Sequence, residues 1–209
     1  MLLTQMKFIS TLTILGYNYH HNMKYIDRTL IFEESKIYFL DEANEEQQVM
    51  MDWEDGLMKK HADYVCINGG DILEIGFGMG ISANYIQQNN PASHTIVENH
   101  PQIIVKAKEW AQGKSNVTIV EGSWIDNLSQ LSEYDGVFYD TYGDTDLDSF
   151  GEHLPSLVKE GGVATWWNSK GETENVFGIE GVAYEHVDIS APDNNYYIKN
   201  IYYLPQKQY

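Results

Sequence analysis

Short apolar runs alternate with longer amphipathic segments along most of the chain from Asp71 onward. The apolar runs predict strands at 71–75 (DILEI), 94–98 (HTIVE), 116–121 (NVTIVE), 134–140 (YDGVFYD) and 161–167 (GGVATWW). The segments between them predict helices at 81–88, 102–112, 127–132 and 147–159. Strands that alternate with helices indicate a parallel sheet that is covered on both faces.

The two ends of the chain show different patterns. The stretch RTLIFEESKIYFLDEANEEQQ (28–48) predicts two short strands around Glu33 to Lys36 and then an acidic turn, and residues 50–61 predict a helix. Near the other end, AYEHVDIS (183–190), a turn and YYIKNIYYLP (196–205) predict an antiparallel hairpin.

A mostly parallel sheet that ends in an antiparallel hairpin is the layout of the Rossmann-like class I methyltransferases. We therefore predict an α/β fold of this kind. We predict a lead-in segment with short strands, residues 1–48, and an α/β domain, residues 49–209, whose layout is that of S-adenosylmethionine-dependent methyltransferases.

Charge and composition narrow the class of protein. A net charge of -18 over 209 residues repels phosphate backbones, so we predict no nucleic-acid partner. The acidity favours solubility and can also attract a cationic substrate. No apolar run is long enough to span a bilayer, and the first residues lack the basic start and cleavage site of a signal peptide. We therefore expect no membrane association.

Cysteine and histidine usage bears on compartment and metals. Cys66 is the single cysteine, so there is no disulfide framework, and we expect a reducing compartment, the cytoplasm. His94, His100 and His153 lack the spacing of a metal site, so we predict no metal. The tyrosines of the predicted hairpin favour packing on both of its faces, and a homodimer contact is one interpretation. They are Tyr196, Tyr197, Tyr202 and Tyr203.

Three glycines follow the strand at 71–75 at alternate positions, Gly76, Gly78 and Gly80. Glycines in a strand-to-helix turn allow a ligand to approach the backbone closely. The dinucleotide fingerprint G-x-G-x-x-G would need a glycine in place of Ile81, so this turn departs from it.

Glu98 ends the second strand of the alternating region, 20 residues after Gly78. An acidic side chain there can accept the ribose hydroxyls of a nucleoside cofactor, although it can also cap the helix that begins near Pro101. These positions alone leave S-adenosylmethionine and NAD open. The glycine spacing and the C-terminal hairpin favour S-adenosylmethionine.

Six segments occur in a characteristic order: VMMDWEDGLM (49–58), DILEIGFGMGIS (71–82), SHTIVENHP (93–101), VEGSWID (120–126), YDGVFYDTY (134–142) and LVKEGGVATWWN (157–168). The set resembles guanidinoacetate N-methyltransferase and its relative, the arginine N-methyltransferase that modifies the internal guanidino nitrogen. GFGMGI followed by SHTIVENHP is closer to the arginine enzyme. One departure is the segment 169–181, which is shorter than the family segment that helps to enclose the substrate.

The resemblance implies an S-adenosylmethionine site and a guanidino site. The residues implied in cofactor binding are Met50, Met58, Glu74, Gly76, Phe77, Gly78, Met79, Gly80, Ile81, Ser82, Glu98, Asn99, His100, Trp124, Ile125 and Asp140. Those implied in substrate binding are Glu54, Asp140, Tyr142, Asn168, Ser169 and Lys170. Glu54 and Asp140 are also the implied catalytic pair.

The two carboxylates suit this chemistry on physical grounds. A guanidinium has a pKa of roughly 13.8, so it must give up a proton, or hold it loosely, to attack a methyl sulfonium. Two carboxylates can bind its planar fork and aim one nitrogen at the methyl group. Asp140, at the carboxyl end of a strand, is the expected proton acceptor, and Glu54 is expected to orient the fork.

Three functions remain open. The first is an S-adenosylmethionine-dependent N-methyltransferase that acts on a guanidino group, in a guanidinoacetate-like small molecule or in arginine. The second is a methyltransferase of the same fold with another small amine or acid as substrate. The third is a non-catalytic, cofactor-binding interaction protein, against which the presence of both Glu54 and Asp140 argues.

Overall fold

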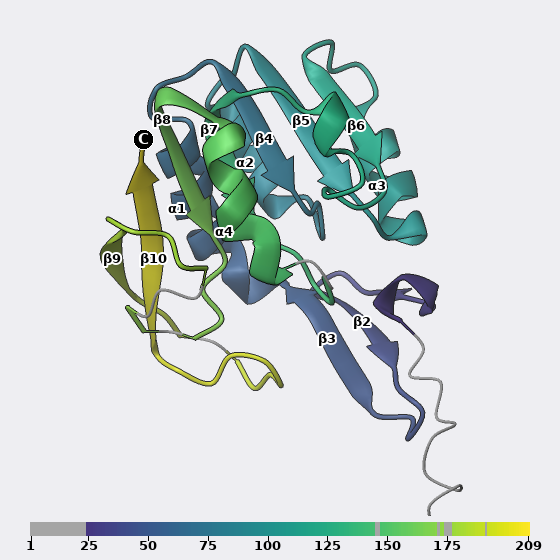
Figure 1. The fold of residues 1–209 in the computed structure, drawn as a ribbon. Helices are drawn as coiled ribbons and strands as arrows, with labels where there is room; N and C mark the ends of the chain where they lie inside the picture. The colour runs from purple at the N-terminus through teal and green to yellow at the C-terminus, as the bar shows by residue number, and fades with distance from the viewer. Residues whose placement is uncertain (1–23, 145–146, 171, 174–176, 191) are drawn as a thin grey trace, which may run out of the picture.

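The computed structural model describes residues 24–209, except 145–146, 171, 174–176 and 191 (Figure 1). Residues 1–23, nearly half of the lead-in segment, therefore lie outside the described residues. A seven-stranded sheet forms the centre of the molecule, with the strand order β6-β5-β4-β7-β8-β10-β9. Its strands are β4 (Asp71–Ile75), β5 (Ser93–Glu98), β6 (Val117–Glu121), β7 (Tyr134–Tyr139), β8 (Val158–Trp166), β9 (Ala183–Asp188) and β10 (Ile201–Gln208).

The direction of the strands confirms the predicted fold. Strands β6, β5, β4, β7 and β8 pair in parallel, while β10 is antiparallel to both β8 and β9. The strand order changes direction at β4. Strands β5 and β6 lie on one side of β4, and the next strand in the chain, β7, lies on the other side. Ligands of open α/β sheets bind at such a reversal, outside the carboxyl ends of the strands.

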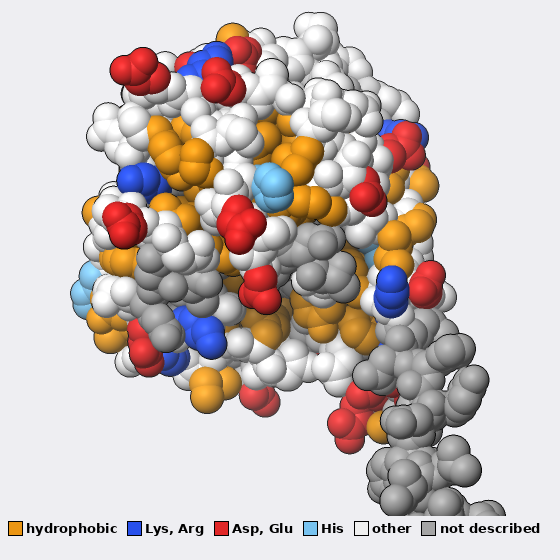
Figure 2. All heavy atoms as spheres, in the orientation of Figure 1, with side chains coloured by type: hydrophobic (Ala, Val, Ile, Leu, Met, Phe, Trp, Pro, Cys, Tyr) orange, Lys and Arg blue, Asp and Glu red, His pale blue; other side chains and the backbone are white. Residues whose placement is uncertain are grey.

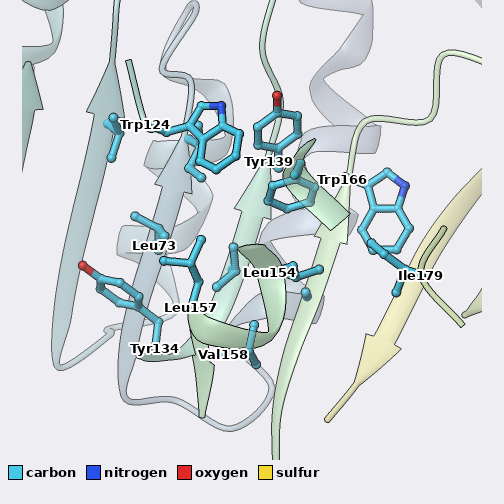
Figure 3. Packing of buried hydrophobic residues seen from close by; sticks show 14 residues of the cluster. Leu73, Trp124, Tyr134, Tyr139, Leu154, Leu157, Val158, Trp166 and Ile179 are labelled. Atoms are coloured by element: carbon cyan, nitrogen blue, oxygen red, sulfur yellow. The ribbon is translucent and has the colours of Figure 1, made fainter. Parts of the chain in front are cut away.

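Helices cover both faces of the sheet (Figure 1). Helices α1 (Asp55–Val65), α2 (Ile81–Gln88) and α3 (Pro101–Ala111) lie on one face, and α4 (Phe150–His153) lies on the other. Successive side chains of a strand point to opposite faces. Ile72 accordingly packs with the residues of α1 and α2, whereas Leu73 packs with Leu154 and Leu157, which lie over the sheet just after α4 (Figure 3).

A separate three-stranded antiparallel sheet precedes α1 and extends away from the main sheet (Figure 1). Its strands are β1 (Ile31–Phe32), β2 (Lys36–Leu40) and β3 (Glu46–Met51). The two strands predicted around Glu33 to Lys36 are confirmed, but β3 was not expected. Because β3 and a 3-10 turn occupy residues 46–54, the helix predicted from residue 50 begins only at Asp55. Residue 48, the predicted end of the lead-in segment, lies within β3.

Two predicted helices are wrong in extent. Residues 127–132 form only a 3-10 turn, Leu128–Gln130. The helix predicted at 147–159 is divided into Leu147–Ser149, Phe150–His153 and Leu154–Ser156, and β8 has already begun at Val158. Pro155 has no N–H to donate and restricts its neighbour, so a continuous helix cannot run through it. The second half of the hairpin also begins late, at Ile201.

Candidate functional site

A cavity of about 530 Å³ opens at the carboxyl ends of the parallel strands, a size suited to a small-molecule site. The predicted site residues that line it come from β3 and the turn after it, the glycine turn and the start of α2, and the segments that follow β5, β6, β7 and β8. They are Met50, Glu54, Gly76, Phe77, Gly78, Ser82, Glu98, Asn99, Trp124, Asp140, Tyr142 and Ser169.

Nine predicted residues do not lie on the cavity wall. They are Met58, Glu74, Met79, Gly80, Ile81, His100, Ile125, Asn168 and Lys170. Several of them support the wall from behind. The Glu74 carboxylate accepts a hydrogen bond from the Ser82 hydroxyl and lies 2.9 Å from His94 Nε2, with all three side chains buried.

Gly76 brings the ends of β4 and β7 together. It has φ +95°, and a Cβ at this position would lie 1.8 Å from the backbone oxygen of Asp140. The Asp140 amide donates to Ile75 O at 2.9 Å, and the Gly76 amide donates to Val97 O at 2.8 Å. A side chain at residue 76 would push Asp140 away, so the glycine sets the position of the predicted catalytic carboxylate.

Met50 packs over the middle of the glycine turn. A Cβ on Gly78, which has φ +52°, would lie 2.5 Å from Met50 Sδ, and the Met79 amide points to the same sulfur at 3.2 Å. The turn is thus held between the end of β3 on one side and the sheet on the other. Met50 therefore lies beside the backbone of the glycine turn and on the wall of the cavity.

Glu98 lies at the end of β5 with only 6 % of its surface exposed. Its carboxylate accepts the amides of Phe77 at 2.8 Å, Asn99 at 2.8 Å and His100 at 2.7 Å. Burial raises the pKa of Glu98, while these backbone hydrogen bonds act in the opposite direction. The side chain therefore both lines the cavity and ties the glycine turn to the start of α3.

Replacement of Glu98 by Ala should weaken S-adenosylmethionine binding by about 1.5–3 kcal/mol, the range for hydrogen bonds to a charged group. The variant loses an acceptor on the cavity wall and releases the Phe77 amide. Glu121→Ala is the matched control, because Glu121 stands opposite Glu98 in the register of β6 but lies outside the cavity and pairs with Lys108. Titration calorimetry measures both affinities. Equal affinities would remove Glu98 from the cofactor site.

Glu54 and Asp140 both line the cavity and are close enough for the charge of Glu54 to act on Asp140. Glu54 ends the 3-10 turn before α1 and is 3 % exposed, and Asp140 directly follows β7. Burial raises the pKa of Glu54 to about 7. Burial, and then the nearby charges of Glu54 and Glu74, raises the pKa of Asp140 well above its ordinary value. Two carboxyls that resist ionisation together form a site that a cation would stabilise.

Aromatic rings surround this pair. Tyr196 donates its hydroxyl to Glu54 Oε1 at 2.6 Å, and its ring stacks on Trp53 with 5.9 Å between centroids. Trp167, which follows β8, lies 6.4 Å from both of these rings. Tyr196 and Trp167 line the cavity, so they can face a bound cation.

Trp124, which also lines the cavity, is held by Asp144, whose Oδ2 accepts hydrogen bonds from the indole N–H at 2.7 Å and from the Tyr139 hydroxyl at 2.5 Å. Tyr142 packs against Tyr25, with 4.9 Å between ring centroids.

Sequence reasoning missed several cavity residues. Tyr25 and Tyr196 come from segments outside the recognised motifs, and Asp126 and Asp144 follow strand ends in loops. Acidic side chains at strand ends were a usable signal for the last two. For Tyr25 and Tyr196 the contacts are long-range, and no local pattern marks them.

Acidic side chains are spread over the face shown in Figure 2, in keeping with the net charge of -18. Within the described residues, no three His, Cys, Asp or Glu side chains are placed to hold a metal ion. None of the helices in that part of the chain combines the length and apolar character that crossing a membrane requires.

Comparison with solved structures supports the fold. N-methyltransferase NodS from Bradyrhizobium japonicum superposes with a TM-score of 0.59 and 15 % identity, covering 75 % of this chain and 96 % of that one. Precorrin-6y C5,15-methyltransferase from Geobacter metallireducens superposes with a TM-score of 0.56 and 16 % identity, covering 75 % and 87 %. At such low identity the likeness concerns the fold alone.

Comparison of sequences identifies the family. Protein arginine N-methyltransferase 2 of Candida glabrata is 36 % identical over 162 residues, and that of Saccharomyces cerevisiae is 34 % identical over 163 residues. Each alignment covers 71 % of this chain, but the chain spans only 37 % of the length of these relatives. The profile of the guanidinoacetate N-methyltransferase family matches residues 41–176, which is more than half of the chain. The chain therefore belongs to the guanidinoacetate N-methyltransferase family.

Proposed function

We propose that this chain is an S-adenosylmethionine-dependent N-methyltransferase that acts on a guanidino group. The observation that carries the proposal is the pair formed by the buried Glu54 carboxyl and the half-buried Asp140 carboxyl, on the wall of one cavity beside the glycine turn. A protein that only bound a nucleoside cofactor would not require a second carboxyl whose charge raises the pKa of Asp140.

The cavity fits S-adenosylmethionine. The backbone of the glycine turn lines the cavity at Gly76 and Gly78, and Glu98 is an acceptor at the end of β5. Acidic side chains dominate the charged part of the wall: Glu54, Glu98, Asp126, Asp140, Asp144 and Asp148, with Lys24 as the basic exception among the described residues. Such a wall complements a ligand that carries sulfonium and ammonium charges.

The carboxyls would bind and prepare the substrate. When bound, S-adenosylmethionine supplies an electrophilic methyl group. Asp140 and Glu54 would hold the guanidinium plane so that one nitrogen faces that methyl group. As this nitrogen forms its new bond, Asp140 would accept the proton that the nitrogen loses. The low polarity around the pair raises the proton affinity of Asp140, which suits it to this role.

The substrate is either a small guanidino compound or an arginine side chain. The family is named for guanidinoacetate, and the relatives with about a third of their residues identical are named for protein arginine. Incubation with labelled S-adenosylmethionine and guanidinoacetate, free arginine or an arginine peptide tests the proposal. Methylation of none of these, with methylation of another amine or acid, would overturn it in favour of the related methyltransferase. Binding of cofactor without any transfer would favour an interaction protein.

The affinity for a guanidinium cation should rise with pH from about 5 to about 8. A cation binds the ionised pair, and burial raises the pKa of Glu54 to about 7 and that of Asp140 well above its ordinary range. Below these pKa values the carboxyls hold protons that binding must displace, so affinity climbs with pH and then levels off. Calorimetry in two buffers of different ionisation enthalpy counts the released protons. An affinity independent of pH in this range would contradict the result.

We further propose that the chain acts in the cytoplasm, without a nucleic-acid or membrane partner. The net charge of -18 and the free thiol of Cys66 support this. We also propose a homodimer, and sedimentation at micromolar concentration can determine the oligomeric state. The hairpin tyrosines do not support a dimer contact, because Tyr197 and Tyr202 are buried within the chain.

A further inference from the structure

The Glu54 carboxylate is fixed from two directions. The Met51 amide donates to its Oε1 at 3.0 Å, and the Tyr196 hydroxyl donates to the same oxygen at 2.6 Å. A carboxylate oxygen has two lone pairs, so these two donors fill Oε1. Within the described residues, Oε2 accepts no hydrogen bond, and Glu54 lines the cavity.

The loop that carries Tyr196 is hydrogen-bonded to a strand that is distant from it in the sequence. Asn195 donates its amide to Gln48 Oε1 at 2.8 Å and its Nδ2 to Glu46 O at 2.7 Å, so the loop is tied to β3. Asn194 Oδ1 accepts the Tyr196 amide at 3.1 Å, which shapes the loop locally. The Tyr196 ring then stacks on Trp53, the residue before Glu54. The hydroxyl is therefore held in place by the backbone and by the ring.

We propose that Tyr196 is a positioning residue that holds the Glu54 carboxylate with a single oxygen, Oε2, free for the substrate. The proposal rests on the function proposed above. It changes the expected geometry, because Glu54 then cannot bind a guanidinium through both oxygens. The guanidinium donates one hydrogen bond to Glu54 Oε2 and the next to Asp140, so it bridges the two carboxylates. This arrangement fixes which of its nitrogens remains for the methyl group.

The electrostatics of the surroundings agree with a donor role for Tyr196. Burial, and then the Glu54 charge, raises the pKa of Tyr196, so its hydroxyl stays protonated. The groups that interact with Glu54 are Tyr196 from the loop, Asp140 after β7 and Tyr202 of β10. Of these, Tyr196 favours the ionised form of Glu54, while the Asp140 charge disfavours it. Loss of the Tyr196 hydroxyl should therefore raise the pKa of Glu54.

The test compares Tyr196→Phe with Tyr197→Phe. The first keeps the ring on Trp53 and removes only the hydroxyl, whereas the second removes a neighbouring hydroxyl that donates to Ile201 O. Carbon-13 resonances of labelled glutamate carboxyls give the Glu54 titration in the protein without ligands, with Glu54→Gln identifying the signal. We expect the midpoint to rise by about one pH unit in Tyr196→Phe, as loss of a charged hydrogen bond predicts, and to stay in place in Tyr197→Phe.

Kinetics provide the second readout. In Tyr196→Phe the KM for the guanidino substrate should rise about fivefold at pH 7, because a pKa that moves from about 7 to about 8 lowers the ionised fraction of Glu54 from about one half to about one tenth, and it should recover at higher pH. S-adenosylmethionine affinity should not change. An unshifted Glu54 titration, or a shift of equal size in Tyr197→Phe, would overturn the assignment. A wild-type protein that methylates no guanidino compound would instead refute the proposed function, and the titration would still show whether Tyr196 controls Glu54.

Discussion

Replacement of Asp140 by Asn should slow single-turnover methyl transfer to the best guanidino substrate by at least about a hundredfold, since general-base catalysis contributes about 10²–10⁴-fold. The amide keeps the shape of the side chain but loses the negative charge and the proton affinity. The cofactor affinity should change much less than the rate, because Asp140 is one of many residues around the cavity.

The double variant gives the sharper result. Glu54→Gln should also slow transfer, and the pair together should lose less than the product of the two single losses, because both carboxylates bind one group. Asp55→Asn is the control, since Asp55 is adjacent to Glu54 but lies on the exposed side of α1, outside the cavity. A near wild-type rate for Asp140→Asn would refute the guanidino mechanism and favour another substrate.

Gly76→Ala should lower the free energy of unfolding by about 2–5 kcal/mol, combining backbone strain of about 1–3 kcal/mol with a steric clash of similar cost. The residue has φ +95°, and the new Cβ would lie 1.8 Å from Asp140 O, a backbone atom that cannot move alone. Relief of the clash must displace either the glycine turn or the end of β7. We therefore also expect the loss of measurable S-adenosylmethionine binding.

Gly113→Ala separates strain from clash. Gly113 also has a positive φ, +80°, but nothing lies within 4 Å of its added Cβ. Its loss of stability should be limited to about 1–3 kcal/mol, which is the cost of the backbone conformation alone. Urea denaturation of both variants measures the difference. Equal losses would show that the contact between residue 76 and Asp140 O is not tight in solution.

The central sheet could be predicted from the sequence because its signals are local. The run 71–75, the glycines after it and the helix at 81–88 lie within one continuous stretch, and the structure places β4 and α2 at those residues. Alternation of such units limits the topology to a few arrangements. The antiparallel C-terminal pair was predictable for the same reason, as two apolar segments separated by a turn.

The errors arise where distant residues decide the local structure. The stretch EEQQVMM reads as a turn and the start of a helix, but it forms β3 because it pairs with β2. The site follows the same rule. Gly76, Glu98 and Asp140 could be located because the carboxyl ends of parallel strands must meet, whereas Tyr196 reaches Glu54 across 142 positions of the chain. No pattern near Tyr196 predicts that contact.

The hydrogen bonds between the loop at 192–200 and β3 suggest how the substrate preference could be changed by mutation. The glycine turn, Glu98 and Trp124 lie within residues 76–124, while the hydroxyl that fixes Glu54 is supplied by a loop outside that stretch. Loops of this kind tolerate replacement better than the strands they join. A library of variants confined to residues 192–200 should therefore yield proteins that accept differently shaped acceptors while retaining the affinity of the parent for the methyl donor.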